Sequence, residues 1–328
     1  MNHIKLIIRN LLGGIFAAGL MLFGVYRRAK RRAMTQPQVT PLFFHTIGKD
    51  LFRKCMLWLK KNGYVFISTD ELVEIIKHRR PMPPKAVWIT FDDGWKENMD
   101  TVIPVIVELN IPVTFFISTD PVEHSGVFWW SYVTRYGRYL PAAYNNLKKL
   151  QAIDEKRRRE LIENLEAKFN GRLKREAMEV KDVISLASKP QITIGCHTAH
   201  HVVMSNCTDE QLAQEIIASR QKLEEWTGKS IIYFCYPDGF FNDHVKEIVK
   251  RHGFELAAST ENRYITGQED PFSMPRFWVR GEGFLAEAKC QMLGIWVPFM
   301  WKLQKWLDID SNLETMFQSI SKTLAEYF

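Results

Sequence analysis

Short apolar, β-branched and aromatic runs recur along this chain from Val39 onward, with amphipathic helical segments between them. This alternation is typical of parallel strands joined by crossover helices. The expected strands are 39–45, 64–67, 86–91, 113–117, 192–196, 231–235 and 254–258. Seven strands in this rhythm favour a distorted or incomplete (β/α) barrel over an open doubly wound sheet. The predicted fold class is therefore α/β.

Capping residues predict where several helices begin. Asp70 precedes ELVEIIKH and Asn242 precedes DHVKEIVKRH, so both are N-cap candidates. Thr208 and Gln211 have the spacing of a capping box, which opens a helix that we expect to end at Gly228.

A length of 328 residues suits one barrel with insertions, and we expect it to occupy 34–283. Residues 121–190 interrupt the strand rhythm with charged helical sequence, including DEKRRRELIENLEAKF. We interpret them as a helical insertion at the active-site end, and the charge run as a solvated helix face.

An uninterrupted apolar run of 16 residues extends from Leu11 to Tyr26, and 23 residues result if it is extended back to Ile4. That is long enough for one bilayer crossing. A signal peptide fits poorly, because an A-x-A site is missing and basic residues follow the run. We expect 1–33 to be a single-pass membrane anchor with a basic flank, and an interfacial helix is the alternative.

Basic residues are more numerous after this run than before it, which predicts a catalytic part on the cytoplasmic face. Residues 284–328 are expected to form C-terminal helices. Within them, the uncharged stretch 292–301 is either a helix packed on the core and kinked at Pro298, or an interfacial helix with tryptophans at headgroup depth.

The net charge is +7, but seven basic and no acidic residues lie in 1–40, and the remainder holds 37 of each sign. We therefore expect no nucleic-acid binding by the folded part. The five cysteines form no Cys-x-x-Cys pair, which favours free thiols in a reducing compartment. Cys196 is expected to point away from its neighbour His197 and to be a core residue. The oligomeric state stays open.

Two motifs carry the chemistry. Thr90-Phe91-Asp92-Asp93-Gly94 follows one strand candidate, and His197-Thr198-Ala199-His200-His201 follows another about a hundred residues later. Two histidines and one carboxylate suit catalytic zinc, with a coordination position left for water. The second carboxylate is then available as a base. One helical turn after the strand would bring His197 and His201 to the same side.

The residues that carry this chemistry all fall just after different strand candidates. They are His45, Asp92, Asp93, His197 and the turn Tyr236-Pro237-Asp238-Gly239. Because the carboxyl ends of barrel strands converge on one mouth, we expect these groups to meet there. Together they predict a metal-dependent hydrolase.

These motifs resemble those of the polysaccharide deacetylases, the nodulation-deacetylase-like group called carbohydrate esterase family 4. The likeness extends from about Val39 to Val279. It implies that Asp93, His197 and His201 hold a divalent metal, most often zinc, and that Asp92 is the general base. It also implies release of acetate from an N-acetyl sugar, with a backbone N–H near Asp238 stabilising the oxyanion.

The chain departs from the family pattern at three places. Cys235 stands where an arginine usually orients the base, and Arg276 is our candidate for supplying that guanidinium; the alternative is an ordinary surface arginine. The late histidine motif is not visible. A subgroup that includes the biofilm poly-N-acetylglucosamine deacetylases has an N-terminal Tyr-His instead, which Phe44-His45 matches, so His45 is the candidate acid. Asp238 replaces a usual aromatic residue.

Substrate contacts are expected from Tyr236, Asp238, Trp95 and Trp129, the tryptophans by stacking on a sugar ring. The expected partners are an N-acetylated saccharide, polymeric or lipid-linked, and a membrane. The alternatives are removal of a formyl or O-acetyl group by the same machinery, or a non-catalytic glycan-binding relative. Phosphate-directed metal chemistry would need a basic pocket or second metal site that the sequence does not show.

Overall fold

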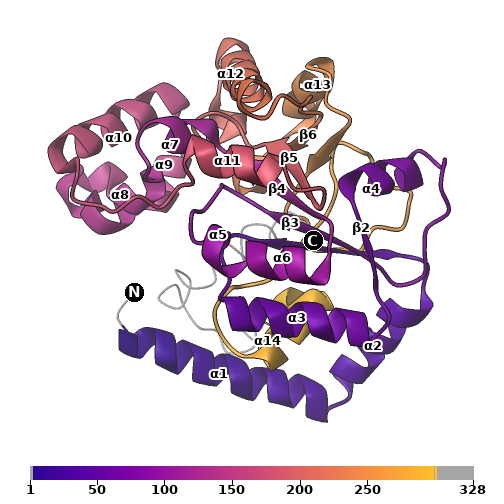
Figure 1. The fold of residues 1–328 in the computed structure, drawn as a ribbon. Coiled ribbons are helices and arrows are strands. Elements are labelled where there is room, and N and C mark those ends of the chain that lie inside the picture. Colours follow the sequence, from indigo (N-terminus) through magenta and orange to yellow (C-terminus); the bar gives the residue numbers. More distant parts are fainter. Residues whose placement is uncertain (1–2, 299, 301–328) are drawn as a thin grey trace. The chain divides into compact units, whose positions relative to one another are not determined.

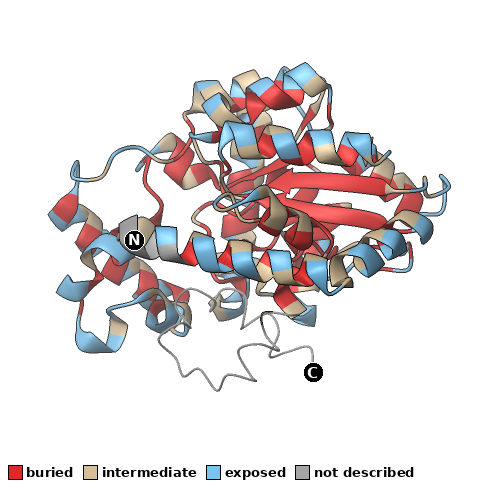
Figure 2. Ribbon diagram, turned by 90° about the horizontal axis from the view of Figure 1, so that it is seen from below, coloured by how far each residue is buried: buried red, intermediate tan, exposed pale blue. Residues whose placement is uncertain are grey.

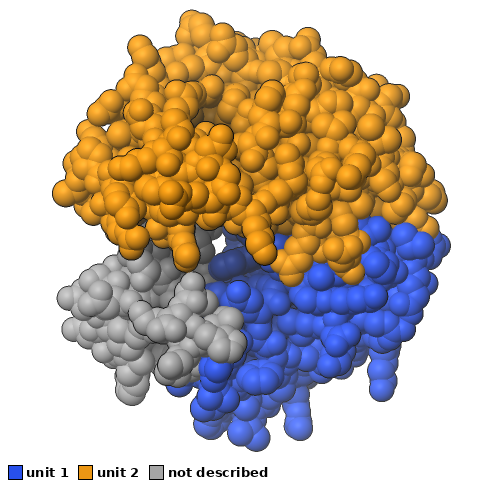
Figure 3. Space-filling model, turned by 60° about the vertical axis from the view of Figure 1, so that its left-hand side comes forward, with its two compact units in different colours: residues 1–90, 101–113, 258–328 blue, residues 91–100, 114–257 orange. Residues whose placement is uncertain are grey.

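The computed structural model describes residues 3–298 and 300. These residues form two compact units, each made from separate stretches of the chain (Figure 3). Unit 1 comprises 1–90, 101–113 and 258–328, and unit 2 comprises 91–100 and 114–257. The predicted domain limits 34–283 and 284–328 stay predictions.

Among the described residues, unit 1 contains the two N-terminal helices, four further helices and four strands (Figure 1). Its elements are α1 (His3–Leu22), α2 (Val25–Thr35), β1 (Val39–Phe44), α3 (Lys49–Lys61), β2 (Val65–Ile67), α4 (Thr69–Ile76), β3 (Ala86–Phe91), α6 (Ile103–Leu109), β8 (Phe277–Trp278) and α14 (Leu285–Met292). Among these strands, β3, β1 and β8 are neighbours in that order, and β2 pairs with β3.

Unit 2 contains the remaining strands and the helical insertion. Its main elements are α5 (Asn98–Thr101), β4 (Val113–Ile117), α7 (Thr119–Glu123), α8 (Trp129–Tyr136), α9 (Leu147–Gln151), α10 (Glu155–Phe169), α11 (Val180–Ala187), β5 (Ile192–Cys196), α12 (Asp209–Thr227), β6 (Tyr233–Cys235), α13 (Asp243–Arg251) and β7 (Leu256–Ala258). Short 3₁₀ turns lie at Gly137–Tyr139, Ala142–Tyr144, Met204–Asn206 and Pro237–Gly239. The strand order is β7-β6-β5-β4.

The α/β class is confirmed, and each of the seven expected strands is present. The pairs β1–β8, β2–β3 and β5–β6 are all parallel. Strands β1, β3 and β4 are buried along their whole length, as continuous apolar runs predict for strands covered on both faces. The eighth strand, Phe277–Trp278, is a two-residue strand beyond the seven expected and lies next to Arg276.

The helix starts follow the capping residues with one exception. Asn242 and Thr208 cap their helices as predicted, and the Thr208–Gln211 capping box is formed. The prediction that Asp70 caps its helix is wrong. The N-cap is Ser68, which forms a capping box with Glu71, so Asp70 lies in the first turn.

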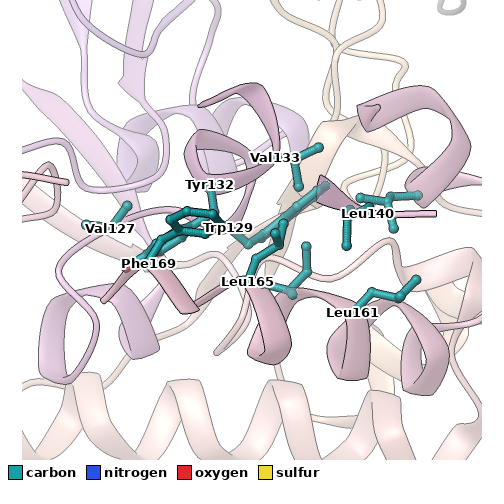
Figure 4. Close-up of a cluster of buried hydrophobic side chains, with 10 residues drawn as sticks. Val127, Trp129, Tyr132, Val133, Leu140, Leu161, Leu165 and Phe169 are labelled. Carbon is teal, nitrogen blue, oxygen red and sulfur yellow. The ribbon is translucent and has the colours of Figure 1, made fainter. Parts of the chain in front are cut away.

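The insertion in unit 2 has its own apolar core (Figure 4). Trp129 and Tyr132 of α8 pack there with Leu161, Leu165 and other buried side chains of α10. The charge run is largely a solvated face, as interpreted, with two buried exceptions. Glu155 and Arg158 of α10 are buried and form an ion pair at 2.6 Å, because they share the helical register of Leu161 and Leu165.

The N-terminal segment forms two helices, and α1 packs on α14 within unit 1. No single helix among the described residues is long and apolar enough for a bilayer crossing; only Arg9–Leu22 taken with Val25–Thr35, at an angle of 71°, meets that test. The predicted single-pass anchor is therefore not confirmed. Trp296 is buried against α1 residues, while residue 299 and the segment 301–328 of the predicted C-terminal helices lie outside the described residues.

Candidate active site

The predicted metal ligands form one buried cluster in unit 2 (residues 91–100 and 114–257). Asp93 follows β3, His197 follows β5, and His201 lies four residues further on. Asp93 Oδ1 lies 3.4 Å from Nε2 of His197 and 3.4 Å from Nε2 of His201. One potential ligand atom from each residue lies within 4.8 Å of the other two. The structure thus brings together three side chains that the sequence separates by a hundred residues.

The spacing of these atoms fits a small divalent cation. Ligand atoms at 2.0–2.2 Å from a tetrahedral ion are about 3.4 Å apart, which is the Asp93–histidine spacing observed. Nδ1 of His197 lies 2.8 Å from the carbonyl oxygen of Cys235. Because a carbonyl only accepts, Nδ1 carries a proton, and Nε2 is the nitrogen that can offer a lone pair to a cation once its own proton is lost. The donor set is suited to zinc, and the residues fit a cation.

Trp95 fixes the orientation of the Asp93 carboxylate. Its indole Nε1–H donates to Asp93 Oδ2 at 2.8 Å, so Oδ1 is the oxygen that faces the two imidazoles. The Trp95 ring also packs on Phe128, with centroids 4.5 Å apart. The sugar-stacking role predicted for Trp95 stays a prediction, and the structure adds a contact with a candidate ligand.

The loops that carry the cluster have an uncommon backbone conformation. Asp93 has φ 74°, Thr198 has φ 60° and His201 has φ 51°, all in the left-handed region. Such conformations in residues other than glycine are strained and concentrate at functional sites. The expected helical turn between His197 and His201 is wrong: the segment is an irregular loop, and its left-handed residues bring the two rings together.

The cluster favours protonated imidazoles when no cation is present. Burial opposes the charged form of His197, but Cys235 and the hydrogen bond with Asp93 outweigh it and raise the pKa of His197 to about 10. Burial likewise opposes the charged form of His201, yet Asp93 and Asp238 raise its pKa. A cation and these protons therefore compete for the same nitrogens.

Asp92 lies beside the cluster and is buried. Its Oδ2 is 3.7 Å from the Sγ of Cys235, and Asp92, His197 and Cys235 form a second group whose potential ligand atoms lie within 4.8 Å. Cys235 was treated in the sequence only as a departure from the family pattern. In the structure its side chain contacts Asp92 and its carbonyl oxygen contacts His197.

The His201 loop is held by residues of the helical insertion, a role that the sequence did not predict for them. Nε1 of Trp129 donates to the carbonyl oxygen of His201 at 3.2 Å, and Nη2 of Arg158 donates to the same oxygen at 3.5 Å. The Trp130 ring packs on the His201 imidazole, with centroids 4.5 Å apart. Trp129 itself is buried in the insertion core, and its predicted contact with substrate stays a prediction.

His200, which was left out of the predicted ligand set, points to a different partner. Its Nδ1 lies 2.7 Å from Oε1 of Glu215, and its backbone N–H donates to Oε2 of the same carboxylate. Glu215 is buried on α12 and also binds Arg159 at 2.8 Å. The sequence did contain a signal for this contact: Glu215 lies on the same apolar face of the helix as Leu212 and Ile216, so it could be expected to be buried.

The turn after β6 supplies the predicted substrate residues. Tyr236 is buried, and its ring stacks on Phe241 at 4.3 Å. Asp238 has φ 56°, and its Oδ2 accepts a hydrogen bond from Gln151 of the insertion at 2.8 Å. Cys196 points away from the cluster, as predicted, and its Sγ lies 3.3 Å from Ser219 Oγ on α12.

His45 and Arg276 belong to unit 1, and their catalytic roles stay predictions. The His45 ring packs edge-on against Phe43 and Trp278. The alternative of a surface Arg276 is wrong, because its side chain is fully buried. Its Nη1 donates to Thr90 Oγ1 at 2.8 Å and its Nε donates to the Ser259 carbonyl at 2.9 Å.

Comparisons with known proteins identify the family of this chain. The family model described as polysaccharide deacetylase matches residues 79–257. A poly-beta-1,6-N-acetyl-D-glucosamine N-deacetylase of Staphylococcus aureus is 21% identical over 246 residues, which cover 73% of this chain and 70% of that protein.

Solved structures show the same fold. IcaB from Ammonifex degensii matches with a TM-score of 0.56 and 16% identity, covering 79% of this chain and 97% of that chain. The deacetylase PplD of Streptococcus pyogenes, solved in complex with acetate, matches with a TM-score of 0.52 and 16% identity over 78% and 97% of the two chains. With the family model spanning more than half of its length, this chain is a hydrolase that belongs to the polysaccharide deacetylase family.

Proposed function

We propose that this protein is a metal-dependent N-deacetylase, which hydrolyses the N-acetyl group of an amino sugar in a polymeric or lipid-linked saccharide. The observation that carries the proposal is Asp93 Oδ1 at 3.4 Å from Nε2 of both His197 and His201, with the Asp92 carboxylate beside them. The name of the staphylococcal relative supports N-acetylglucosamine as the sugar.

Asp93, His197 and His201 would hold the cation, zinc being the ion that two imidazoles and a carboxylate favour. When bound, such an ion lowers the pKa of a water and polarises a carbonyl oxygen. Trp95 keeps one Asp93 oxygen on the ligand side, and the Cys235 carbonyl keeps His197 in the tautomer that presents Nε2.

Asp92 is the proposed general base. It accepts a proton from the attacking water as the water oxygen bonds to the acetyl carbon. Arg276 is the proposed positioning residue for this base. Its Nη1 donates to Thr90 Oγ1, and Thr90 lies two residues before Asp92 along the chain.

His45 is the proposed general acid. The C–N bond breaks when the leaving nitrogen takes a proton from His45, giving acetate and a free amine. A backbone N–H near Asp238 is the proposed donor to the oxyanion, and Trp95, Trp129 and Tyr236 are the proposed contacts of the sugar.

An acetate-release assay on N-acetylglucosamine oligomers tests this function. We expect activity with added Zn²⁺, loss of at least a hundredfold in Asp92→Asn, and no change in the control Asp209→Asn, whose carboxylate is exposed on α12. Cation binding without acetate release in the wild type would instead indicate a glycan-binding relative. Faster release from formyl or O-acetyl substrates would favour those reactions.

A further inference from the structure

The N-terminal helix α1 has one face built into unit 1. Arg9, Gly13, Ala17 and Leu20 recur at helical spacing and are all buried. A Cβ on Gly13 would lie 2.5 Å from a carboxylate oxygen of Glu287, so a larger residue there would displace that side chain. Arg9 forms a buried ion pair with Glu287, whose other contacts include Gln291 Nε2 at 3.0 Å.

The opposite face of α1 is apolar and exposed. Along the helix that begins at the N mark, Figure 2 shows exposed and buried residues in alternation. We call the exposed side chains the apolar stripe: Ile7, Leu11, Leu12, Ile15, Leu22 and Phe23. Ile15 is 70% exposed and Phe23 is 87% exposed. Clustered apolar side chains at such exposure mark an interaction surface rather than a solvated one.

The helix that follows the stripe is strongly basic. Five of the eleven residues of α2 are arginine or lysine and none is acidic. Arg27, Arg28, Arg31 and Arg32 are exposed. The first acidic residue of the chain is Asp50, so nothing on α1 or α2 offsets this charge. An exposed apolar face next to exposed cations is the pattern of helices that lie in the interface of anionic bilayers.

We propose that α1 and α2 dock this protein on the surface of an anionic lipid bilayer, with the apolar stripe in the headgroup–acyl boundary and the α2 arginines on lipid phosphates. A crossing is disfavoured because α1 would have to leave α14 and expose the Arg9–Glu287 pair to hydrocarbon. A second copy is disfavoured because it would bring two basic α2 helices together. This inference does not depend on the proposed catalytic function.

Vesicle sedimentation of the purified full chain tests the proposal. We expect binding to vesicles with 30% phosphatidylglycerol in phosphatidylcholine, weakened by salt, and much weaker binding to pure phosphatidylcholine. Ile15→Ser/Leu22→Ser/Phe23→Ser should weaken binding to both by tenfold or more. The matched control is Val107→Ser/Ile184→Ser/Ile217→Ser, three exposed apolar residues on other helices, which should bind as the wild type does.

A second variant set separates charge from apolar contact. Arg27→Gln/Arg28→Gln/Arg31→Gln should lower binding to anionic vesicles by about tenfold or more, since each cation near the surface contributes about fivefold. The control Arg79→Gln/Arg80→Gln/Arg157→Gln removes the same charge from other exposed arginines and should leave binding unchanged.

Four outcomes would overturn the proposal. The first is that the wild type does not bind to anionic vesicles. The second is that the apolar-stripe variant binds to them as strongly as the wild type does. Self-association in ultracentrifugation that the stripe variant abolishes would assign the surface to a second copy. Resistance to alkaline carbonate extraction from membranes, with release only by detergent, would indicate a crossing.

Discussion

Arg158 and Trp129 donate to the same atom, the carbonyl oxygen of His201, and the Arg158 guanidinium lies 4.5 Å from the centroid of the Trp129 ring. Both residues come from the helical insertion, on α10 and α8. The insertion therefore holds a loop that carries a candidate metal ligand.

Trp129→Phe should lower cation affinity by about tenfold, the lower end of the effect of losing a contact behind a ligand. The change removes the indole N–H and leaves a smaller aromatic ring in the core of the insertion, so the melting temperature should fall as well. Competition with a chromophoric chelator measures the affinity, and Trp226→Phe on α12 is the control. Equal affinities for both variants would show that the indole N–H does not position His201.

Gly94→Ala should destabilise the protein and lower cation affinity. Gly94 has φ 91°, and a Cβ there would lie 3.1 Å from Ile117 Cγ2, so both backbone and neighbour must move. The control Gly228→Ala has φ 64° and no atom within 4 Å. In urea unfolding we expect the control to lose about 1 kcal/mol and Gly94→Ala clearly more. If both variants lost similar stability and Gly94→Ala kept the cation affinity of the wild type, the expected crowding between position 94 and Ile117 would be contradicted.

Cation binding should release protons and strengthen as pH rises from 6 to 8. The pKa of His197 is raised to about 10, so a cation displaces a proton from this imidazole at pH 7, and the raised pKa of His201 adds to the competition. Calorimetry in phosphate and in Tris measures the proton release. Identical binding heats in the two buffers would count against it.

As pH rises, Glu166→Gln should lose less folding stability than the wild type does. Burial, together with Asp120 and Glu163, raises the pKa of Glu166 to about 7, above the value of about 4.3 in the unfolded chain. The folded state therefore binds more protons between these values, and stability falls as pH rises from 4.3 through 7. Because the group is partly exposed, we expect about 1 kcal/mol or less. Urea unfolding at several pH values measures the stability of both proteins. If the stability of Glu166→Gln fell with pH as steeply as that of the wild type, the prediction would be wrong.

Arg9→Met should destabilise unit 1 by about 3 kcal/mol or more, because Glu287 would stay buried without its cation. Arg9→Met/Glu287→Met should recover much of the loss. The exposed pair Arg53–Glu108 is the control, and Arg53→Met should cost far less, because solvent screens that pair. Thermal and urea unfolding measure these effects, and equal costs for the two arginines would show that α1 is not held by this ion pair.

The strands and the metal cluster were predictable because their signals are local. Each expected strand is a continuous apolar run, and each candidate ligand follows such a run at the carboxyl end of a parallel strand. The left-handed residues Asp93, Thr198 and His201 were not predictable, since their conformation is imposed by the cluster and by the packing around it. For that reason the expected helical turn was wrong.

Buried charges were the other omission. Arg158 and Glu215 looked like members of solvated charge runs, although each shares the helical register of buried leucine or isoleucine residues. Ser68-x-x-Glu71 was likewise a capping box in the sequence, but Asp70 was chosen because it directly precedes the apolar run. Charge considered together with helical register would have identified Arg158 and Glu215 as buried. The Ser-x-x-Glu spacing would have identified Ser68 as the N-cap.

Cys235 contacts two residues of the site with different atoms. Its thiol lies next to Asp92, and its backbone carbonyl oxygen accepts a hydrogen bond that orients His197. Exchange of the side chain therefore changes the surroundings of Asp92, the proposed base, while the imidazole keeps its hydrogen bond to the main chain. Such a division lets basicity and ligand alignment vary independently at one position.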